Sequence, residues 1–370
     1  MPTEDERKAK HQRVVEYLQA HKLDAVLLSR RCNFSWFTCG ARNYVNTGDD
    51  LGNSWLLVDK AGAAVLTTNI EATRFRLEEF PSGDVGVIEY PYHDAAAREA
   101  AFVKALGDRQ VATDACPPWL SLPPLEDDFD RLRWTLTAEE IARYRALCRD
   151  TAIAVETTAR QVAPGQGEHH AAGVLAGRVR SAGCLPWVLL VAGDERVERF
   201  RHPLPTDHRI ARYFLLVVCA ERDGLVAACS RLACFGRAGE ELARKHRAVA
   251  NVDAAMILST RPGATLGQVH DAGRQAYAAE GFPDEWRLHH QGGSCGYQPR
   301  EVIAYPGCDI EVLANQAFAW NPSITGTKSE DTILCTAGGA EVLDGGTDWP
   351  AVEATWGGRK IRRAAILERS

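Results

Sequence analysis

The sequence lacks the features that would place a chain in a membrane or send it through one. It contains no run of about 18 consecutive apolar residues, which excludes a transmembrane helix of ordinary length. The first residues, 1–7, are polar and acidic, and they lack the basic and apolar parts of a signal peptide. We therefore expect a cytoplasmic protein.

Cysteine is present in a pattern that argues against crosslinks. There are 11 cysteines, an odd number, and they are scattered along the chain without a C-x-x-C pair. A disulfide framework or a structural zinc site would show tighter spacing. We expect most of these cysteines to be small buried side chains in a reducing compartment.

The sequence also lacks a large excess of either positive or negative charge. With 43 basic and 49 acidic residues the net charge is −6, which gives no reason to expect nucleic-acid or membrane partners. The chain has 370 residues, of which 45% are hydrophobic and 25% charged, as in ordinary globular proteins of two or three domains.

The order of the expected elements divides the chain. Strands and helices alternate through residues 1–125, which predicts a small α/β domain that ends in the proline-rich segment 116–125. Residues 126–345 then read as helices, strands, helices and strands, which is typical of an α+β domain. This domain includes a helix over 138–162 with a capping box at Thr137 and Glu140. Residues 346–370 are predicted to be a tail over the surface.

Polar side chains are concentrated in residues 288–331, between strand-like apolar segments at 312–320 and 332–336. Polar groups carried by rigid apolar elements are typical of a chemical site. The stretch contains His289, His290, Gln291, Tyr297, Arg300, Glu301, Asn321, Glu330 and Asp331.

Seven segments occur in an order that resembles one known superfamily. They are residues 23–40, 133–147, 200–203, 214–236, 290–293, 321–323 and 330–332. Together they resemble the creatinase, prolidase and methionine aminopeptidase superfamily. The resemblance implies a creatinase-type amino-terminal α/β domain followed by a "pita-bread" domain, α+β overall. It also implies a homodimer.

The departures from that family concern its metal ligands. The family holds two ions with two Asp, one His and two Glu, a ligand set suited to divalent ions that activate water. Here the resemblance places the two Asp positions on Val217 and Ala228 and the first Glu position on Asn321, so that only His290 and Glu330 are kept. We therefore expect no metal and no other cofactor.

The resemblance then assigns roles without a metal. His202, at the substrate-side histidine of the family, and His290 would transfer protons, Glu330 would orient substrate or water, and Tyr297 would stabilise charge. Arg300 would bind a substrate carboxylate, and Asn321 and Gln291 would donate hydrogen bonds to a developing oxyanion. The remaining candidates for substrate binding are Glu301, Glu221 and Arg222. Cys295 is expected to be a buried, inert thiol.

Three hypotheses remain open. The first is a metal-independent hydrolase or lyase that acts on a C–N bond, amide or amidine-like, of a small amino-acid-derived molecule, as in a tailoring step of specialised metabolism. The second is a pseudo-peptidase that binds a partner without catalysis. The third is an Xaa-Pro-type metallopeptidase whose ligands lie elsewhere in the sequence.

Overall fold

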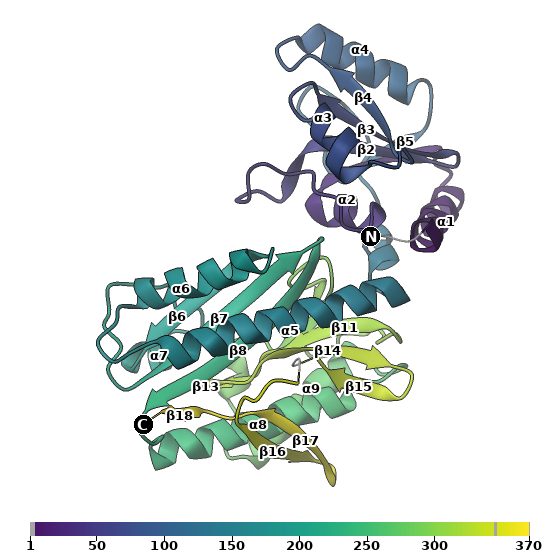
Figure 1. The fold of residues 1–370 in the computed structure, drawn as a ribbon. Coiled ribbons are helices and arrows are strands. Elements are labelled where there is room, and N and C mark those ends of the chain that lie inside the picture. Colours follow the sequence, from purple (N-terminus) through teal and green to yellow (C-terminus); the bar gives the residue numbers. More distant parts are fainter. Residues whose placement is uncertain (1–3, 344–345, 370) are drawn as a thin grey trace. The chain divides into compact units, whose positions relative to one another are not determined.

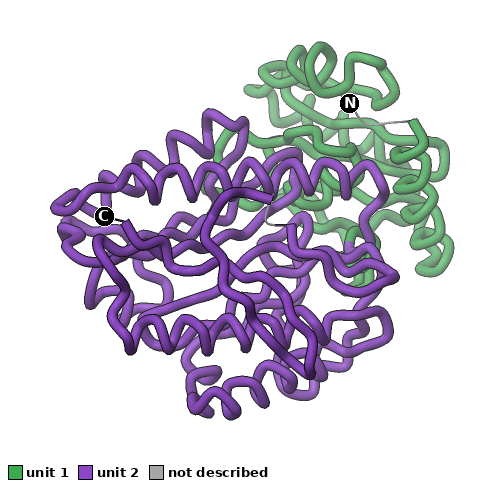
Figure 2. Tube along the Cα trace, turned by 60° about the horizontal axis from the view of Figure 1, so that its bottom comes forward, with its two compact units in different colours: residues 1–133 green, residues 134–370 purple. Residues whose placement is uncertain are grey.

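A computed structural model describes residues 4–343 and 346–369 and divides the chain into two compact units, Met1–Arg133 and Trp134–Ser370 (Figure 2). The boundary lies after the expected linker because a 3-10 helix, Asp127–Arg133, still belongs to the first unit. Its Phe129 packs edge-on against Tyr17 and Trp36, with ring centroids 5.0 and 6.3 Å apart.

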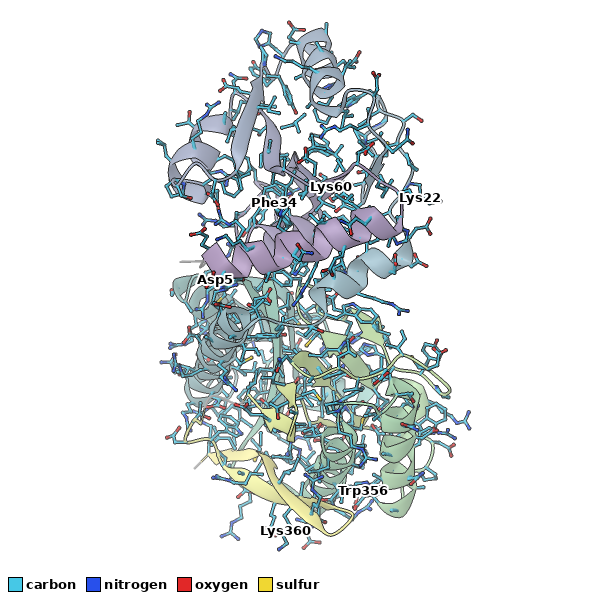
Figure 3. All side chains as sticks on the ribbon, turned by 90° about the vertical axis from the view of Figure 1, so that its right-hand side faces the viewer. Asp5, Lys22, Phe34, Lys60, Trp356 and Lys360 are labelled. Carbon is cyan, nitrogen blue, oxygen red and sulfur yellow. The ribbon has the colours of Figure 1, made fainter. Side chains whose placement is uncertain are left out.

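The first unit is a five-stranded sheet with helices, as its alternating pattern predicts (Figure 1). The strand order is β4-β3-β2-β1-β5, with β1 Ala25–Arg30, β2 Leu51–Asp59, β3 Gly62–Thr68, β4 Gly86–Tyr90 and β5 Val111–Thr113. The helical segments are α1 Glu4–Ala20, α2 Arg31–Phe37, α3 Ala72–Arg74, a π-helical turn Phe75–Glu79 and α4 Ala95–Leu106. In Figure 3 the labelled Phe34 of α2 points into this unit, where it is fully buried.

The second unit is built on a nine-stranded sheet. Its main path is β10-β9-β11-β14-β8-β7-β6, while β15 pairs with β14 and β18 with β8. The strands are β6 Leu185–Gly193, β7 Tyr213–Arg222, β8 Leu225–Phe235, β9 Gly292–Cys295, β10 Val302–Ile303, β11 Gln316–Trp320, β14 Asp331–Thr336, β15 Gly339–Val342 and β18 Leu367–Arg369. Two small hairpins complete it, β12 Ser323–Ile324 with β13 Thr327–Lys328, and β16 Ala351–Trp356 with β17 Arg359–Ala364.

Helix α5, Ala138–Gln161, begins where the sequence predicts a helix. The other helices of this unit are α6 Glu168–Ser181, α7 Glu195–Arg199, α8 Glu240–Ser259 and α9 Leu266–Ala279, with a 3-10 turn at Glu285–Leu288. The predicted capping box is formed, since Thr137 Oγ1 accepts from the Glu140 N–H at 3.2 Å and Glu140 Oε2 accepts from the Thr137 N–H at 2.7 Å. Helices α8 and α9 bury Met256 and Val269 in one apolar cluster with Phe318 and Trp320 of β11.

The last residues differ from the expected surface tail. Strand β18 extends the sheet by pairing in parallel with β8, and the β16–β17 hairpin packs against α8. Alternation along β17 sends Lys360 outward, where Figure 3 labels it, but turns Arg363 inward to a side chain only 2% exposed. Two buried carboxylates, Asp253 and Asp331, attract that guanidinium with N–O distances of 2.7 and 2.9 Å.

The cysteines follow the sequence prediction. All 11 are free, and all but Cys116 are buried. Within the described residues, no helix is both long and apolar enough to cross a membrane.

Candidate functional site

Four residues of the candidate site lie in one row across neighbouring strands of the large sheet. They are Asn321, Glu330, Ser230 and Val217. Trp320 pairs with Asp331, and Asp331 pairs with Cys229, so the next register position places Glu330 between Asn321 and Ser230. Ser230 in turn pairs with Val217. Because paired residues of antiparallel strands share a face, these four side chains lie on the same side of the sheet.

The neighbouring residues face the other way. Arg231 donates from Nε to Glu156 of α5 at 2.9 Å and from Nη1 to Asp331 at 2.8 Å. Successive side chains of a strand alternate between faces, so Ser230 and Glu330 lie on the face opposite α5. The site is therefore formed on that opposite face, while Arg231 and Asp331 belong to the buried ion network beneath the helices.

Glu330 is the most completely bonded residue of the row. Its Oε1 accepts from Arg300 Nη2 at 2.9 Å, and its Oε2 lies 2.8 Å from Lys328 Nζ and accepts from Ser230 Oγ at 2.5 Å. Burial alone would raise the pKa of this carboxyl, but the two cations and the hydroxyl outweigh burial and lower it to about 2. Glu330 is therefore a permanent anion with two cationic partners.

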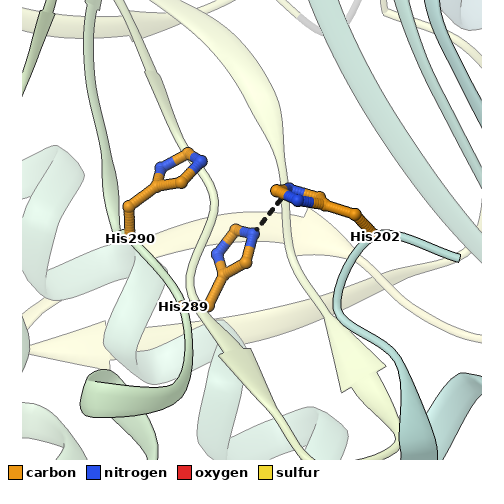
Figure 4. Close-up of side chains that lie close together, drawn as sticks. All are labelled: His202, His289 and His290. Carbon is orange, nitrogen blue, oxygen red and sulfur yellow. Dashed lines mark hydrogen bonds between the residues drawn. The ribbon is translucent and has the colours of Figure 1, made fainter.

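Three histidines gather in one cluster (Figure 4), and the charges of Lys328 and Glu330 act on all three rings. Nε2 of His289 lies 2.9 Å from Nε2 of His202, so one of the two nitrogens carries the shared proton. The ring of His290 stacks on that of His289 with centroids 4.4 Å apart. His202 is exposed while the other two are partly buried, so His202 is the member of the cluster that solvent reaches most readily.

The histidines are neutral at ordinary pH. Burial is the first cause that lowers their pKa values, the positive charge of Lys328 adds to it for all three, and that of Arg300 adds to it for His202 and His290. The pKa falls to about 4 for His290 and to about 2 for His289, and that of His202 is also lowered. Each ring thus offers one N–H and one lone pair for hydrogen bonds.

His290 directs its N–H toward the cluster. Its Nδ1 accepts a hydrogen bond from the Gly292 N–H at 3.2 Å, so the proton of the neutral ring is assigned to Nε2. Figure 4 shows that this second nitrogen points toward His202. A ring in this tautomer donates a hydrogen bond to a ligand and does not present a lone pair there.

Like the three histidines, a second group of side chains could offer three metal ligands. It consists of Asp194, Glu195 and His208. Asp194 is already the acceptor for the backbone N–H groups of Ala211 and Arg212, at 2.8 and 2.7 Å, and His208 Nε2 lies 3.0 Å from it. Burial would raise its pKa, but these hydrogen bonds prevail and lower it. Asp194 therefore serves to connect residues 194–213, a structural role.

Two predicted site residues are engaged in structural hydrogen bonds. Tyr297 is buried and donates its phenol hydrogen to Glu140 Oε1 at 2.6 Å, so it supports the capping box of α5. Gln291 is buried too, with Nε2 donating to the carbonyls of Trp286 and His289 and Oε1 accepting from Tyr277. Neither group is directed by these bonds toward Glu330.

The remaining predicted residues lie in three different settings. Asn321 is buried, and its Oδ1 has no hydrogen-bond partner. Glu301 accepts from the Tyr297 N–H at 3.1 Å. Glu221 accepts from the Gly224 N–H at 2.7 Å, and Arg222 pairs with Asp150 at 2.6 Å, so both are used at the turn of the β7–β8 hairpin.

Cys295 is buried as expected, and burial is the first cause that raises its pKa, to about 12. The glycine pair Gly292 and Gly293 has a packing role. A Cβ on Gly292 would lie 2.1 Å from the Ala319 carbonyl oxygen, and one on Gly293 would lie 1.9 Å from that of Val302. The pair therefore lets neighbouring strands approach.

Sequence reasoning missed Lys328, Ser230 and the role of His289. Lys328 stands two residues before Glu330, and in an extended segment that spacing puts both side chains on one face. This spacing was the available signal, but residues 326–328 read as a surface turn. Ser230 and His289 have no sequence signal, because their importance depends on pairing between distant strands.

Comparisons with known proteins agree with this architecture. A model of metallopeptidase family M24 matches residues 142–337. The chain is similar to a prolidase from Pyrococcus horikoshii (18% identity, TM-score 0.77, 90% of this chain and 97% of that one). It is similar to an Xaa-Pro dipeptidase from Bacillus anthracis (16%, 0.77, 98% and 99%) and to dipeptidase PepE from Mycobacterium ulcerans (16%, 0.76, 98% and 98%).

Among curated proteins, none matches the chain by sequence. At these identities the structural likeness establishes the fold, and it confirms the predicted α+β pita-bread architecture with a creatinase-type amino-terminal domain.

Proposed function

Because this chain belongs to metallopeptidase family M24, we propose that it is an enzyme that cleaves a C–N bond of a small amino-acid-derived molecule. We propose further that it does so without the pair of ions for which the family is named. The observation that carries the proposal is that Lys328 and Arg300 bind both carboxylate oxygens of Glu330.

The donor set does not fit two divalent ions. A cation that approached Glu330 would meet Lys328 and Arg300, whose nitrogens already lie 2.8 and 2.9 Å from its oxygens. The hairpin positions Val217 and Ala228, both buried and apolar, offer no ligand. His290 directs an N–H toward the cluster, as described above, where a metal would need a lone pair.

The histidine cluster supports proton transfer in place of metal chemistry. His202 has a lowered pKa, so its neutral form can accept a proton from water as that water adds to the carbonyl carbon of an amide. The same imidazolium then returns the proton to the leaving nitrogen, which completes hydrolysis of the C–N bond. His289 holds His202 in place, and the N–H of His290 stabilises the oxyanion that forms.

Purified protein tests both parts of the proposal. We expect metal analysis after dialysis to find far less than one tightly bound ion per chain. We expect cleavage of some member of a panel of N-acyl amino acids, carbamoyl amino acids and dipeptides to be unaffected by a chelator. Replacement of His202 by Ala should lower kcat by about 100-fold or more, as for loss of a general base.

His169→Ala is the matched control, because His169 is exposed in the first turn of α6 and should change nothing. Two ions per chain that survive dialysis, together with chelator-sensitive turnover, would instead support an Xaa-Pro-type metallopeptidase. A folded protein that cleaves no member of the panel would support the pseudo-peptidase.

Two properties belong to the same proposal. We propose that the protein is a homodimer in the cytoplasm and that its partner is the small-molecule substrate. Light scattering on the full chain tests the dimer, with a monomer at micromolar concentration as the contrary result.

A further inference from the structure

We propose that Lys328 and Arg300 form a fixed cationic centre that receives an anionic group of the substrate, so that the substrate is an acidic amide such as an N-acyl amino acid with a free carboxylate. This inference rests on the proposed function, because it names the class of molecule for the same site. It also gives a role to Lys328, which the family resemblance leaves unassigned.

The charges at the site do not balance. Lys328 and Arg300 contribute two positive charges and Glu330 a single negative one, and the three side chains are only 6%, 12% and 2% exposed. A buried cation without a counter-charge is unfavourable, because its hydration is lost and nothing replaces it. An anion that binds beside Lys328 and Arg300 would supply the missing charge.

The histidine cluster and the other side chains of the row do not supply that charge. His202, His289 and His290 are neutral, and the positive charge of Lys328 helps to keep them so by lowering the pKa of each ring. Ser230 and Asn321, on either side of Glu330 in the row, are uncharged. The carboxylates of Glu301 and Glu140 are directed to the backbone N–H and the phenol of Tyr297, whereas the cations Lys328 and Arg300 contact the oxygens of Glu330.

Hydrogen-bonding capacity remains open at the same place. Lys328 has three ammonium hydrogens, and its contact with Glu330 uses one. The Nε–H of Arg300 and the Oδ1 of Asn321 are both buried without a hydrogen-bond partner. Buried polar atoms without partners are rare in folded proteins, and a ligand that brings both an acceptor and a donor would satisfy them.

These open groups match an acidic amide. A carboxylate supplies acceptor oxygens for the ammonium and guanidinium hydrogens, and charge-assisted hydrogen bonds of this kind are the strong ones. The amide N–H of the same molecule would supply a donor for Asn321 Oδ1. The scissile amide would then lie near the histidine cluster, whose rings lie in the field of the two cations.

Calorimetric titration of the full-length protein tests the inference with two probes, N-acetylglycine and its uncharged counterpart N-acetylglycinamide. We expect N-acetylglycine to bind at least about tenfold more tightly, the factor that corresponds to one charge-assisted contact. Lys328→Met should remove this preference, while Lys328→Arg, which keeps the charge, should retain most of it. Lys360→Met is the control, because Lys360 is exposed and pairs with Glu353 on the β16–β17 hairpin.

Equal affinity for the two probes in the unmodified protein would overturn the inference, as would a preference that survives in a folded Lys328→Met variant. Circular dichroism establishes that each variant is folded before titration. The titration reports affinity, and product analysis of the same samples reports cleavage, so the result can be separated from the proposed function. Selective binding without cleavage contradicts only the proposed activity, and cleavage of uncharged amides without selective binding contradicts only the anionic substrate.

Discussion

Lys328 Nζ lies 2.8 Å from Glu330 Oε2, and the two residues stand two positions apart in one extended segment. This contact places an ammonium group where the family resemblance leads one to expect a divalent ion. Arg300 approaches the other carboxylate oxygen at 2.9 Å from a distant part of the chain. The ionic state of the site is thereby set by side chains.

The first prediction concerns the stability that Glu330 provides. In Glu330→Gln, Lys328 and Arg300 lose their shared counter-charge while they remain buried. We expect the free energy of unfolding to fall by about 3–5 kcal/mol, as for other buried ion pairs that lose one partner. Urea denaturation measures it, with Glu353→Gln on the exposed hairpin as a control within about 0.5 kcal/mol. A loss below about 1 kcal/mol for Glu330→Gln would mean that the pair is hydrated.

The second prediction concerns the C-terminal hairpin. Arg363 bridges Asp253 and Asp331, and Asp331 also accepts from Arg231. Arg363→Met leaves two buried carboxylates short of a cation, so we expect a loss of about 3–5 kcal/mol in urea denaturation. Arg359→Met on the same strand is the control, since Arg359 is exposed. Similar losses for both variants would disprove a special role of the buried network.

The third prediction concerns pH and His246 of α8. Its Nδ1 lies 2.7 Å from Thr327 Oγ1 and its Nε2 lies 2.9 Å from the Ala364 carbonyl oxygen, so it links β13 to the end of β17. Burial is the first cause that lowers its pKa, from 6.5 to about 4. As pH falls from 6.5, the unfolded chain takes up this proton but the folded chain does not.

The contribution of His246 to the free energy of unfolding should therefore be complete above pH 6.5 and should decrease as the pH falls toward 4. We expect a loss of about 2 kcal/mol by pH 5 from this residue. Urea denaturation at several pH values measures the slope. His246→Gln, which does not titrate, should have a shallower slope over the same range. Parallel slopes for the two proteins would show that His246 titrates normally in the folded state.

The fourth prediction separates a structural from a catalytic role for Tyr297. The Tyr297 hydroxyl donates a hydrogen bond to the carboxylate of Glu140. Tyr297→Phe removes this bond and should lower the free energy of unfolding by about 1–3 kcal/mol. We expect kcat on whichever substrate is identified to change less than about threefold, because the phenol is already committed to Glu140. A 100-fold fall in kcat with unchanged stability would restore the catalytic assignment.

The sequence by itself determined the fold class and singled out the stretch that carries the candidate site. The α/β alternation of the first unit and helix α5 with its capping box follow from local periodicity and turn chemistry, which act over a few residues. The resemblance to the creatinase and prolidase superfamily, rather than a local pattern, then placed Glu330, Asn321 and Val217 at the positions of the family's metal ligands. The boundary at Arg133 escaped prediction, because it depends on Phe129 packing against residues about a hundred positions earlier.

Only the tertiary structure decided which polar side chains meet. Arg300, Ser230 and Glu330 come from three separate segments, and strand register alone brings them together. In the sequence, Tyr297 and Gln291 could not be distinguished from the other polar candidates for the site. In the structure, Tyr297 bonds Glu140 of the capping box and Gln291 bonds the backbone carbonyl of His289. The inward turn of Arg363 was likewise hidden, because alternation fixes the period of a strand but not which face will be buried. Long-range pairing, which no local pattern encodes, thus decided the charge and partners of the site.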